Sequence, residues 1–355
     1  MKHTTIVQSN TRKRELYFDI LRVVSIFSIV LLHVATFKIN YYSVMSRDWL
    51  VLTFFSSVAR FAVPVFVMIS GALFLSRDGE GIPKKNIIRL VTAFTFWSAY
   101  YAIVVFWQSR DINLAIVSFL KGHAHLWFII MILGLYLLLP FFRTIVSSKK
   151  LMRYFLLLWF IFSILVPEIR RVLSFHQGVP NTISQILQYY IDNSHIHFPI
   201  GFSGFFVLGY YLHTTQISKK IRLCLYVLGA AAAIGTTALT AGASGYYNEF
   251  SYVFSNSNTV CIVLQSVGLF VLVKYLCNRK PNAKSKLIYH LSKYSFGVYL
   301  VHGSVIEMLD MFCNINAEVM NPIISVPIVA AIVLLISITV SCVLNHIPVL
   351  NKYIV

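Results

Sequence analysis

The sequence predicts an all-α integral membrane protein, a polytopic helical bundle of about ten transmembrane helices with both termini in the cytoplasm. First, 58% of the 355 residues are hydrophobic and only 12% are charged, whereas soluble domains are about 45–50% apolar and about 25% charged. Second, the mean hydropathy is +0.74, and the apolar residues gather into stretches close to the roughly 20 residues that cross a bilayer. Third, short basic segments separate these stretches, as in multi-span membrane proteins.

Ten apolar stretches are candidate spans. The first follows Arg12, Lys13 and Arg14, as in a signal peptide, but it is too long for one and lacks a small-residue cleavage site, so we expect it to remain as the first span. Pro64 lies in the second stretch, and proline is tolerated in membrane helices that pack against others. The fifth and sixth stretches are short. In order, the predicted spans are residues 16–37, 50–75, 87–107, 124–142, 151–167, 196–213, 221–243, 259–277, 289–312 and 321–345.

These spans predict a single membrane domain, residues 16–345, between cytoplasmic tails at residues 1–15 and 346–355. The tails and the loops on one side hold 21 lysine and arginine residues, whereas the loops on the other side hold 6. This asymmetry predicts that both termini are cytoplasmic, which requires an even number of spans. It also explains the net charge of +18 by membrane topology, so we expect membrane lipids and no nucleic acid as partners.

The cysteines do not predict a disulfide framework or a metal site. Their number is odd and no Cys-x-x-Cys occurs, so we expect them to behave as small buried hydrophobic residues. They are Cys224, Cys261, Cys277, Cys313 and Cys342.

Arg22 and His33 in the first span are the strongest functional candidates. An arginine in the hydrocarbon costs at least a few kcal/mol, and histidine changes its protonation most readily near neutral pH. Eleven residues at about 100° each bring both side chains within about 20° of one helix face, roughly 16 Å apart along the axis. The loop charges place Arg22 toward the cytoplasm and His33 toward the outside. An ion pair between Arg22 and Asp19 is the structural alternative for the arginine, but it does not explain His33.

Further cations lie in and after the second span. Arg60 falls near the middle of this span, where an arginine needs an anionic partner or a water-filled cavity. Lys84, Lys85 and Arg89 follow on the cytoplasmic side. Topology alone explains such a cluster; alternatively it binds phosphate groups, for which arginine and lysine are the usual partners.

Four later residues are candidates because of their place in the membrane. His125 and Trp127 begin the fourth span, where such residues are usually structural. His302 and Glu307 lie in the ninth span. A histidine at mid-membrane is ordinarily a satisfied core residue, yet ionisable residues within spans are functional candidates. The glycines of the segment 204–212 are typical of helices that approach closely.

Together these segments resemble the acyltransferase-3 family of integral membrane acyltransferases, which O-acetylate cell-surface glycans. The spacing Arg22-x10-His33 matches the signature of this family. The likeness runs from about Glu15 to about Leu344, nearly the whole chain. Four more segments follow in the order of the family: Arg60…Pro64…Ser70-Gly71, His125-Leu-Trp-Phe128, Gly204–Leu212 and Tyr294–His302.

The resemblance implies transfer of an acyl group, commonly acetyl from acetyl-CoA, to a hydroxyl of an extracytoplasmic glycan or other cell-envelope acceptor, in the cytoplasmic (inner) membrane. His33, with Arg22, is then expected to be catalytic, as a general base or as an acyl-histidine nucleophile. We expect no metal. The acyl-CoA is expected to bind Arg22, Arg60, Lys84, Lys85 and Arg89, with oxyanion stabilisation as the alternative role of Arg60. The acceptor is expected to meet His125, Trp127, His302 and Glu307.

Two other functional classes fit the same charges. A flippase or exporter of a lipid-linked glycan also needs a polar interior, although the chain lacks the matching halves common in transporters. A non-catalytic subunit that works with polysaccharide-biosynthesis partners is the second alternative.

Overall fold

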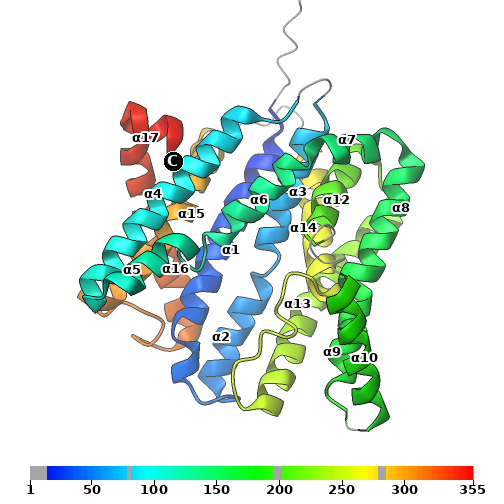
Figure 1. Ribbon diagram of the computed structural model, residues 1–355, viewed down its shortest axis with the longest axis horizontal. Helices are drawn as coiled ribbons and strands as arrows, with labels where there is room; N and C mark the ends of the chain where they lie inside the picture. Colours follow the sequence, from blue (N-terminus) through cyan, green and yellow to red (C-terminus); the bar gives the residue numbers. More distant parts are fainter. Residues whose placement is uncertain (1–13, 78–80, 177, 195–200, 279–284, 355) are drawn as a thin grey trace, which may run out of the picture.

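The computed structural model describes residues 14–354 apart from 78–80, 177, 195–200 and 279–284, and all regular structure in this part is helical (Figure 1). Residues 1–13 of the predicted N-terminal tail lie outside the described residues. The helices are α1 (Leu16–Phe37), η1 (Ile39–Tyr41), α2 (Arg47–Val58), α3 (Ala62–Leu75), α4 (Lys84–Ser109), α5 (Ile112–Lys121), α6 (Trp127–Leu137), α7 (Leu139–Ser147), α8 (Lys149–Trp159), η2 (Phe160–Leu165), α9 (Val166–Leu173), α10 (Val179–Ser194), α12 (Ser203–Thr214), α13 (Lys219–Tyr247), α14 (Val260–Asn278), α15 (Lys286–Cys313), α16 (Pro322–His346) and α17 (Pro348–Tyr353).

Among the described residues, 7 helical segments are long and apolar enough to cross a membrane. They are α1 with η1, the pair α2–α3, α4, α13, α14, α15 and α16. The pair α6–α7 passes the same test but is bent by 57°, which gives up to 8. The membrane-protein prediction is thus supported by the fold, whereas the predicted count of ten is not confirmed.

The fifth and sixth predicted spans account for the difference. The fifth coincides with three consecutive short elements, α8, the π-helical η2 and α9. The sixth, residues 196–213, overlaps α12, which has only 12 residues, and its residues 196–200 lie outside the described part of the chain. Neither α8 nor α12 alone has the roughly 20 residues that a crossing helix needs.

The second predicted span, residues 50–75, corresponds to the pair α2–α3, which the structure builds as one span with a break in its helix. Helix α2 ends at Val58 and α3 begins at Ala62. Pro64 explains the break, because a proline cannot donate a hydrogen bond to the carbonyl of residue 60 and its ring clashes with that turn. As a consequence, Arg60 lies in the break between two helices.

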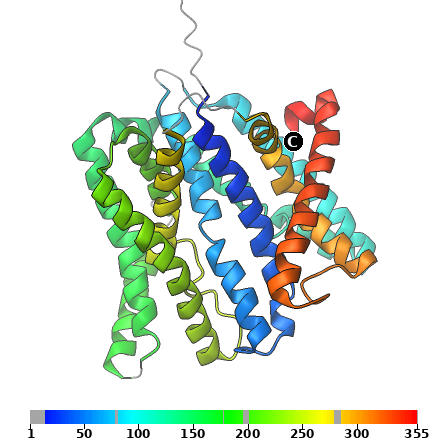
Figure 2. The same ribbon diagram turned by 180° about the vertical axis from the view of Figure 1, so that it is seen from behind.

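Helix α1 lies in the middle of the bundle and contacts α2, α3, α14, α15 and α16. Both views show it between the other long helices (Figures 1 and 2). The start of α1 and the last helix, α17, lie at the same end of the bundle, which we call the Arg22 end; the opposite end is the His33 end. That the Arg22 end faces the cytoplasm remains a prediction from the loop charges.

The packing of α3 on α12 depends on two glycines. A Cβ atom on Gly71 would lie 1.8 Å from the carbonyl oxygen of Phe206, and one on Gly209 would lie 2.0 Å from that of Met68. Any larger residue at either position would force the backbones apart. The close approach expected for the segment 204–212 is therefore observed, and α3 is its partner.

A short helix that the sequence analysis did not predict, α5, reverses the chain after α4. Arg110 adopts a left-handed conformation with φ 56°, and the Asp111 side chain caps α5 by accepting from the backbone amides of Asn113 and Leu114. Gly122 ends the helix with φ 72°, a region that glycine enters without steric cost. This reversal brings the segment that follows, with His123 and His125, back into the bundle.

Candidate functional site

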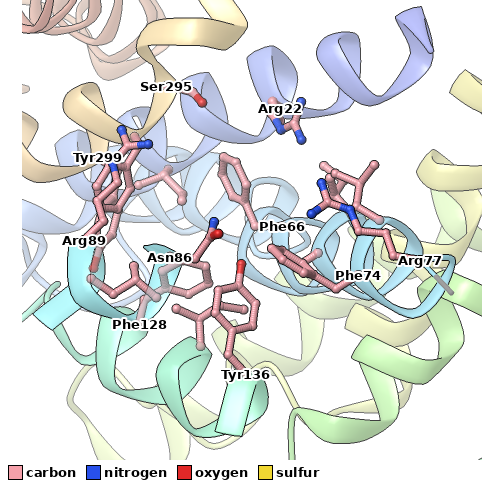
Figure 3. Close-up of a pocket in the computed structure, with 17 residues that line it drawn as sticks. Arg22, Phe66, Phe74, Arg77, Asn86, Arg89, Phe128, Tyr136, Ser295 and Tyr299 are labelled. Atoms are coloured by element: carbon pink, nitrogen blue, oxygen red, sulfur yellow. The ribbon is translucent and has the colours of Figure 1, made fainter. Parts of the chain in front are cut away.

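A cavity of about 340 Å³ lies on the Arg22 end of α1. Its polar lining includes three guanidinium groups: Arg22 comes from α1, Arg77 follows α3, and Arg89 comes from the start of α4, next to Asn86. Figure 3 shows these side chains around the pocket, with Tyr136 of α6 opposite. Apolar side chains of α3, α4 and α6 form most of the remaining wall.

Arg22 makes only part of the predicted ion pair. Its Nη1 lies 3.2 Å from Oδ1 of Asp19, but Asp19 also accepts two bonds of 2.7 Å from Arg14 and one of 2.8 Å from the hydroxyl of Ser292. The carboxylate is thus compensated largely by Arg14, and bonding to Asp19 raises the pKa of the Arg14 guanidinium. The Arg22 side chain, 27% exposed, faces the cavity.

The cationic cluster is not the one that the sequence analysis expected. Arg89 lines the cavity, with its guanidinium carbon 5.1 Å from the ring centre of Phe296. Lys84 and Lys85 are exposed on the first turn of α4 and do not line it. Arg77, which we did not predict, contributes a third guanidinium.

A second cavity, of about 120 Å³, adjoins the first toward the His33 end. It is lined by His33, Arg60, His125 and Trp127. Arg22 and His33 therefore both face cavities on one side of α1, as the helical spacing predicted. Arg60 lies beside His33 and away from the first cavity.

Arg60 is a buried cation with unused donors. Its Nε and Nη2 atoms are buried and have no hydrogen-bond partner among the described residues. The ring centre of Tyr252 lies 5.8 Å from the guanidinium carbon. Because buried charges are ordinarily paired, this group is suited to an anion that enters the second cavity.

The two cavities share three lining residues: Ile29, Phe128 and Tyr299. The rings of Phe128 and Tyr299 lie 5.5 Å apart, centre to centre. These residues form the constriction between a cationic chamber and a chamber that contains histidine.

Histidines are gathered around the second cavity. The ring of His302 lies 5.1 Å from that of His33 and 4.9 Å from that of His125, centre to centre. His302 is buried, and its Nδ1 donates to the carbonyl of Tyr299 at 2.7 Å. The hydroxyl of Tyr299 in turn donates to the carbonyl of His125 at 2.5 Å. Tyr299 therefore orients the ring of His302 and holds the backbone of His125.

Comparison with protein-family models decides between the functional classes. The family described as an acyltransferase domain, acyltransferase-3, matches residues 15–346. The chain belongs to the acyltransferase-3 family. No match was found among curated proteins or among solved structures.

Membership in the acyltransferase-3 family makes this chain a membrane acyltransferase, a class of enzyme that uses an acyl donor. Among the described residues, no group of three or more His, Cys, Asp and Glu side chains is arranged to hold a metal ion. Of the site residues predicted from the sequence, Arg22 and Arg89 line the first cavity, and His33, Arg60, His125 and Trp127 line the second. His302 contacts His33, and Glu307 bonds to His123 beyond the histidines of the second cavity. Lys84 and Lys85 are exposed.

Proposed function

We propose that this membrane acyltransferase transfers a short acyl group, first of all acetyl, from cytoplasmic acyl-CoA to a hydroxyl of an extracytoplasmic glycan or other cell-envelope acceptor, in the cytoplasmic (inner) membrane. One observation carries the proposal. A cationic cavity and a cavity with histidine adjoin along one face of α1 and meet at Ile29, Phe128 and Tyr299.

The first cavity suits the donor. CoA carries phosphates, and guanidinium groups bind phosphate oxygens through charge-assisted, often bidentate hydrogen bonds. Arg22, Arg77 and Arg89 supply three such groups around an otherwise mainly apolar chamber, in which the pantetheine arm would lie. Lys84 and Lys85, exposed on the same end of α4, would meet phosphates that remain outside.

The second cavity suits the reaction. Neutral His33 would accept the proton of the acceptor hydroxyl as its oxygen attacks the thioester carbonyl. Charge then develops on the carbonyl oxygen, and donors that are already in place for it are often the largest contribution to catalysis. Arg60 has two buried, unused donor atoms beside His33, so we assign it to this oxyanion. An acyl-histidine intermediate would use the same residues.

The size of the second cavity favours a small acyl group. A water molecule takes about 30 Å³ of liquid, so about 120 Å³ holds only a few heavy atoms. His125 and Trp127 line the same cavity and would contact the acceptor, with Trp127 46% exposed. A sugar hydroxyl approaching from the His33 end would meet the acyl group there.

The test is acyl transfer by purified protein in liposomes with acetyl-CoA and isolated envelope glycans. We expect His33→Ala to lower kcat by about 10²–10⁴-fold, the range for loss of a general base. His176→Ala is the matched control, because His176 is exposed and lines neither cavity. Full turnover by His33→Ala would exclude the mechanism. If the wild type consumes no acetyl-CoA with any envelope glycan, the proposed donor and acceptor are wrong.

A further inference from the structure

A third cavity, of about 310 Å³, lies on the other side of the histidines from the second. Its lining includes His123, Glu307, Asp310, Tyr101 and Gln108. Nothing in the proposed acyl transfer requires this chamber. It does, however, share a row of hydrogen-bonded side chains with the second cavity.

The row begins at Glu307. Its Oε1 lies 3.1 Å from Nε2 of His123, and Nδ1 of His123 lies 2.7 Å from Nδ1 of His125. His125 lines the second cavity with His33. The row therefore runs from one cavity to the other through two imidazole rings.

The partners of each ring determine which nitrogen carries the proton. A carboxylate only accepts hydrogen bonds, so Nε2 of neutral His123 donates to Glu307 and its Nδ1 accepts from Nδ1 of His125. Nε2 of His125 is then the nitrogen with the lone pair. This atom is buried and, among the described residues, has no hydrogen-bond partner.

His302 is prepared in the same way. Its Nδ1 donates to the carbonyl of Tyr299, so its Nε2 carries the lone pair, and this atom too is buried without a partner among the described residues. Its ring lies between those of His33 and His125, 5.1 Å from the first and 4.9 Å from the second. Two proton acceptors are thus available next to the base.

We propose that the row His125–His123–Glu307 is a proton relay that carries the proton taken up by His33 into the third cavity. This inference rests on the proposed acyl transfer. In that reaction the acceptor oxygen forms a bond to the acyl carbon and the carbon–sulfur bond breaks, so CoA leaves as a thiolate and is protonated by cytoplasmic water. The hydroxyl proton on His33 passes to Nε2 of His125, directly or through His302.

The remaining steps are proton transfers along hydrogen bonds that are already present in the structure. His125 gives the proton on its Nδ1 to Nδ1 of His123, and His123 gives the proton on its Nε2 to the carboxylate of Glu307. Glu307 is 32% exposed and releases a proton to water in the third cavity. His123 is held in line by Tyr101, whose ring stacks on it with centres 4.1 Å apart.

Other charged groups nearby are already engaged. Asp310 lines the third cavity, but it is paired with Lys38 at 2.7 Å and bonded to Asn316 at 2.7 Å. Lys38 also lies 3.5 Å from Glu318. Glu307 is therefore the carboxylate that continues the row.

The experiment uses the full-length protein in liposomes and measures kcat, KM for acetyl-CoA and the solvent deuterium isotope effect. Glu307→Gln keeps an oxygen that accepts from His123 but cannot take up its proton. We expect Glu307→Gln and His123→Ala to lower kcat by about tenfold or more, as for loss of a proton-transfer step, with unchanged KM and an increased isotope effect. Gln108→Ala, in the wall of the same cavity, is the control and should match the wild type.

Chemical rescue separates a relay from a structural role. Imidazole fits the third cavity, so added imidazole should restore activity to His123→Ala and not to His33→Ala. Unchanged kcat and isotope effect in both relay variants would overturn the proposal, as would loss of activity in His123→Ala that imidazole does not restore. An inactive wild type, by contrast, would refute the acyl transfer itself.

Discussion

Phe128→Ala tests whether the constriction between the two cavities limits the length of the acyl group. Phe128 lines both cavities, and its ring lies 5.5 Å from Tyr299 and 6.3 Å from Phe66. Replacing the ring by a methyl group widens the passage through which, in the proposed mechanism, the thioester reaches His33. Longer acyl chains then gain access to buried apolar surface, and each buried methylene contributes about 0.8 kcal/mol.

This contribution corresponds to about a fourfold gain, since 1.36 kcal/mol is a factor of ten in rate. We therefore expect kcat/KM for propionyl-CoA and butyryl-CoA, relative to acetyl-CoA, to rise by about fourfold per added methylene in Phe128→Ala. The assay is donor competition in liposomes, with the products separated by mass.

Phe66→Ala is the matched control, because Phe66 lines only the first cavity. It removes the same ring without widening the shared wall, so the ratio between donors should stay as in the wild type. Equal donor ratios in the wild type and Phe128→Ala would refute the assignment of the constriction.

Three other variants test the remaining parts of the site and fold. Arg22→Ala should raise KM for acyl-CoA by at least about tenfold, because it removes a charge-assisted hydrogen bond of about 1.5–3 kcal/mol. Thermal stability should change little, because Arg14 still neutralises Asp19. An unchanged KM would exclude Arg22 from donor binding. Arg60→Ala should lower kcat by about 10²–10³-fold with KM retained, as for loss of an oxyanion donor; a change in KM alone would contradict this role. Gly209→Ala should destabilise the protein by about 1–3 kcal/mol through overpacking, measured as a lower melting temperature in detergent. Gly134→Ala should leave the melting temperature unchanged, because nothing lies within 4 Å of its added Cβ. Equal melting temperatures of the two variants would argue against the close α3–α12 contact.

The fold class could be predicted because long apolar stretches leave few alternatives to membrane helices. The predicted first span has the bounds of α1, residues 16–37. The breaks could not be predicted in the same way. Proline is tolerated in many membrane helices, so Pro64 alone does not predict that α2 ends at Val58 and α3 begins at Ala62.

The part of the candidate site that could be predicted consists of residues on a single helix. Helical periodicity placed Arg22 and His33 on one face because α1 is a regular helix. Contacts between distant segments carry no such signal: His123 and Glu307 are 184 residues apart. Arg77 lies outside the predicted spans and resembles any cytoplasmic arginine until α3 directs it into the cavity.

The constriction at Ile29, Phe128 and Tyr299 also bears on the electrical insulation of the membrane. An enzyme with aqueous chambers at both ends would leak ions if these chambers merged, and each elementary charge that crosses releases about 2.3 kcal/mol per 100 mV. Two aromatic rings and an isoleucine present little to which a hydrated ion can bind. The side chains to which the proposed mechanism assigns selection of a small acyl group would thereby also help to maintain the membrane potential.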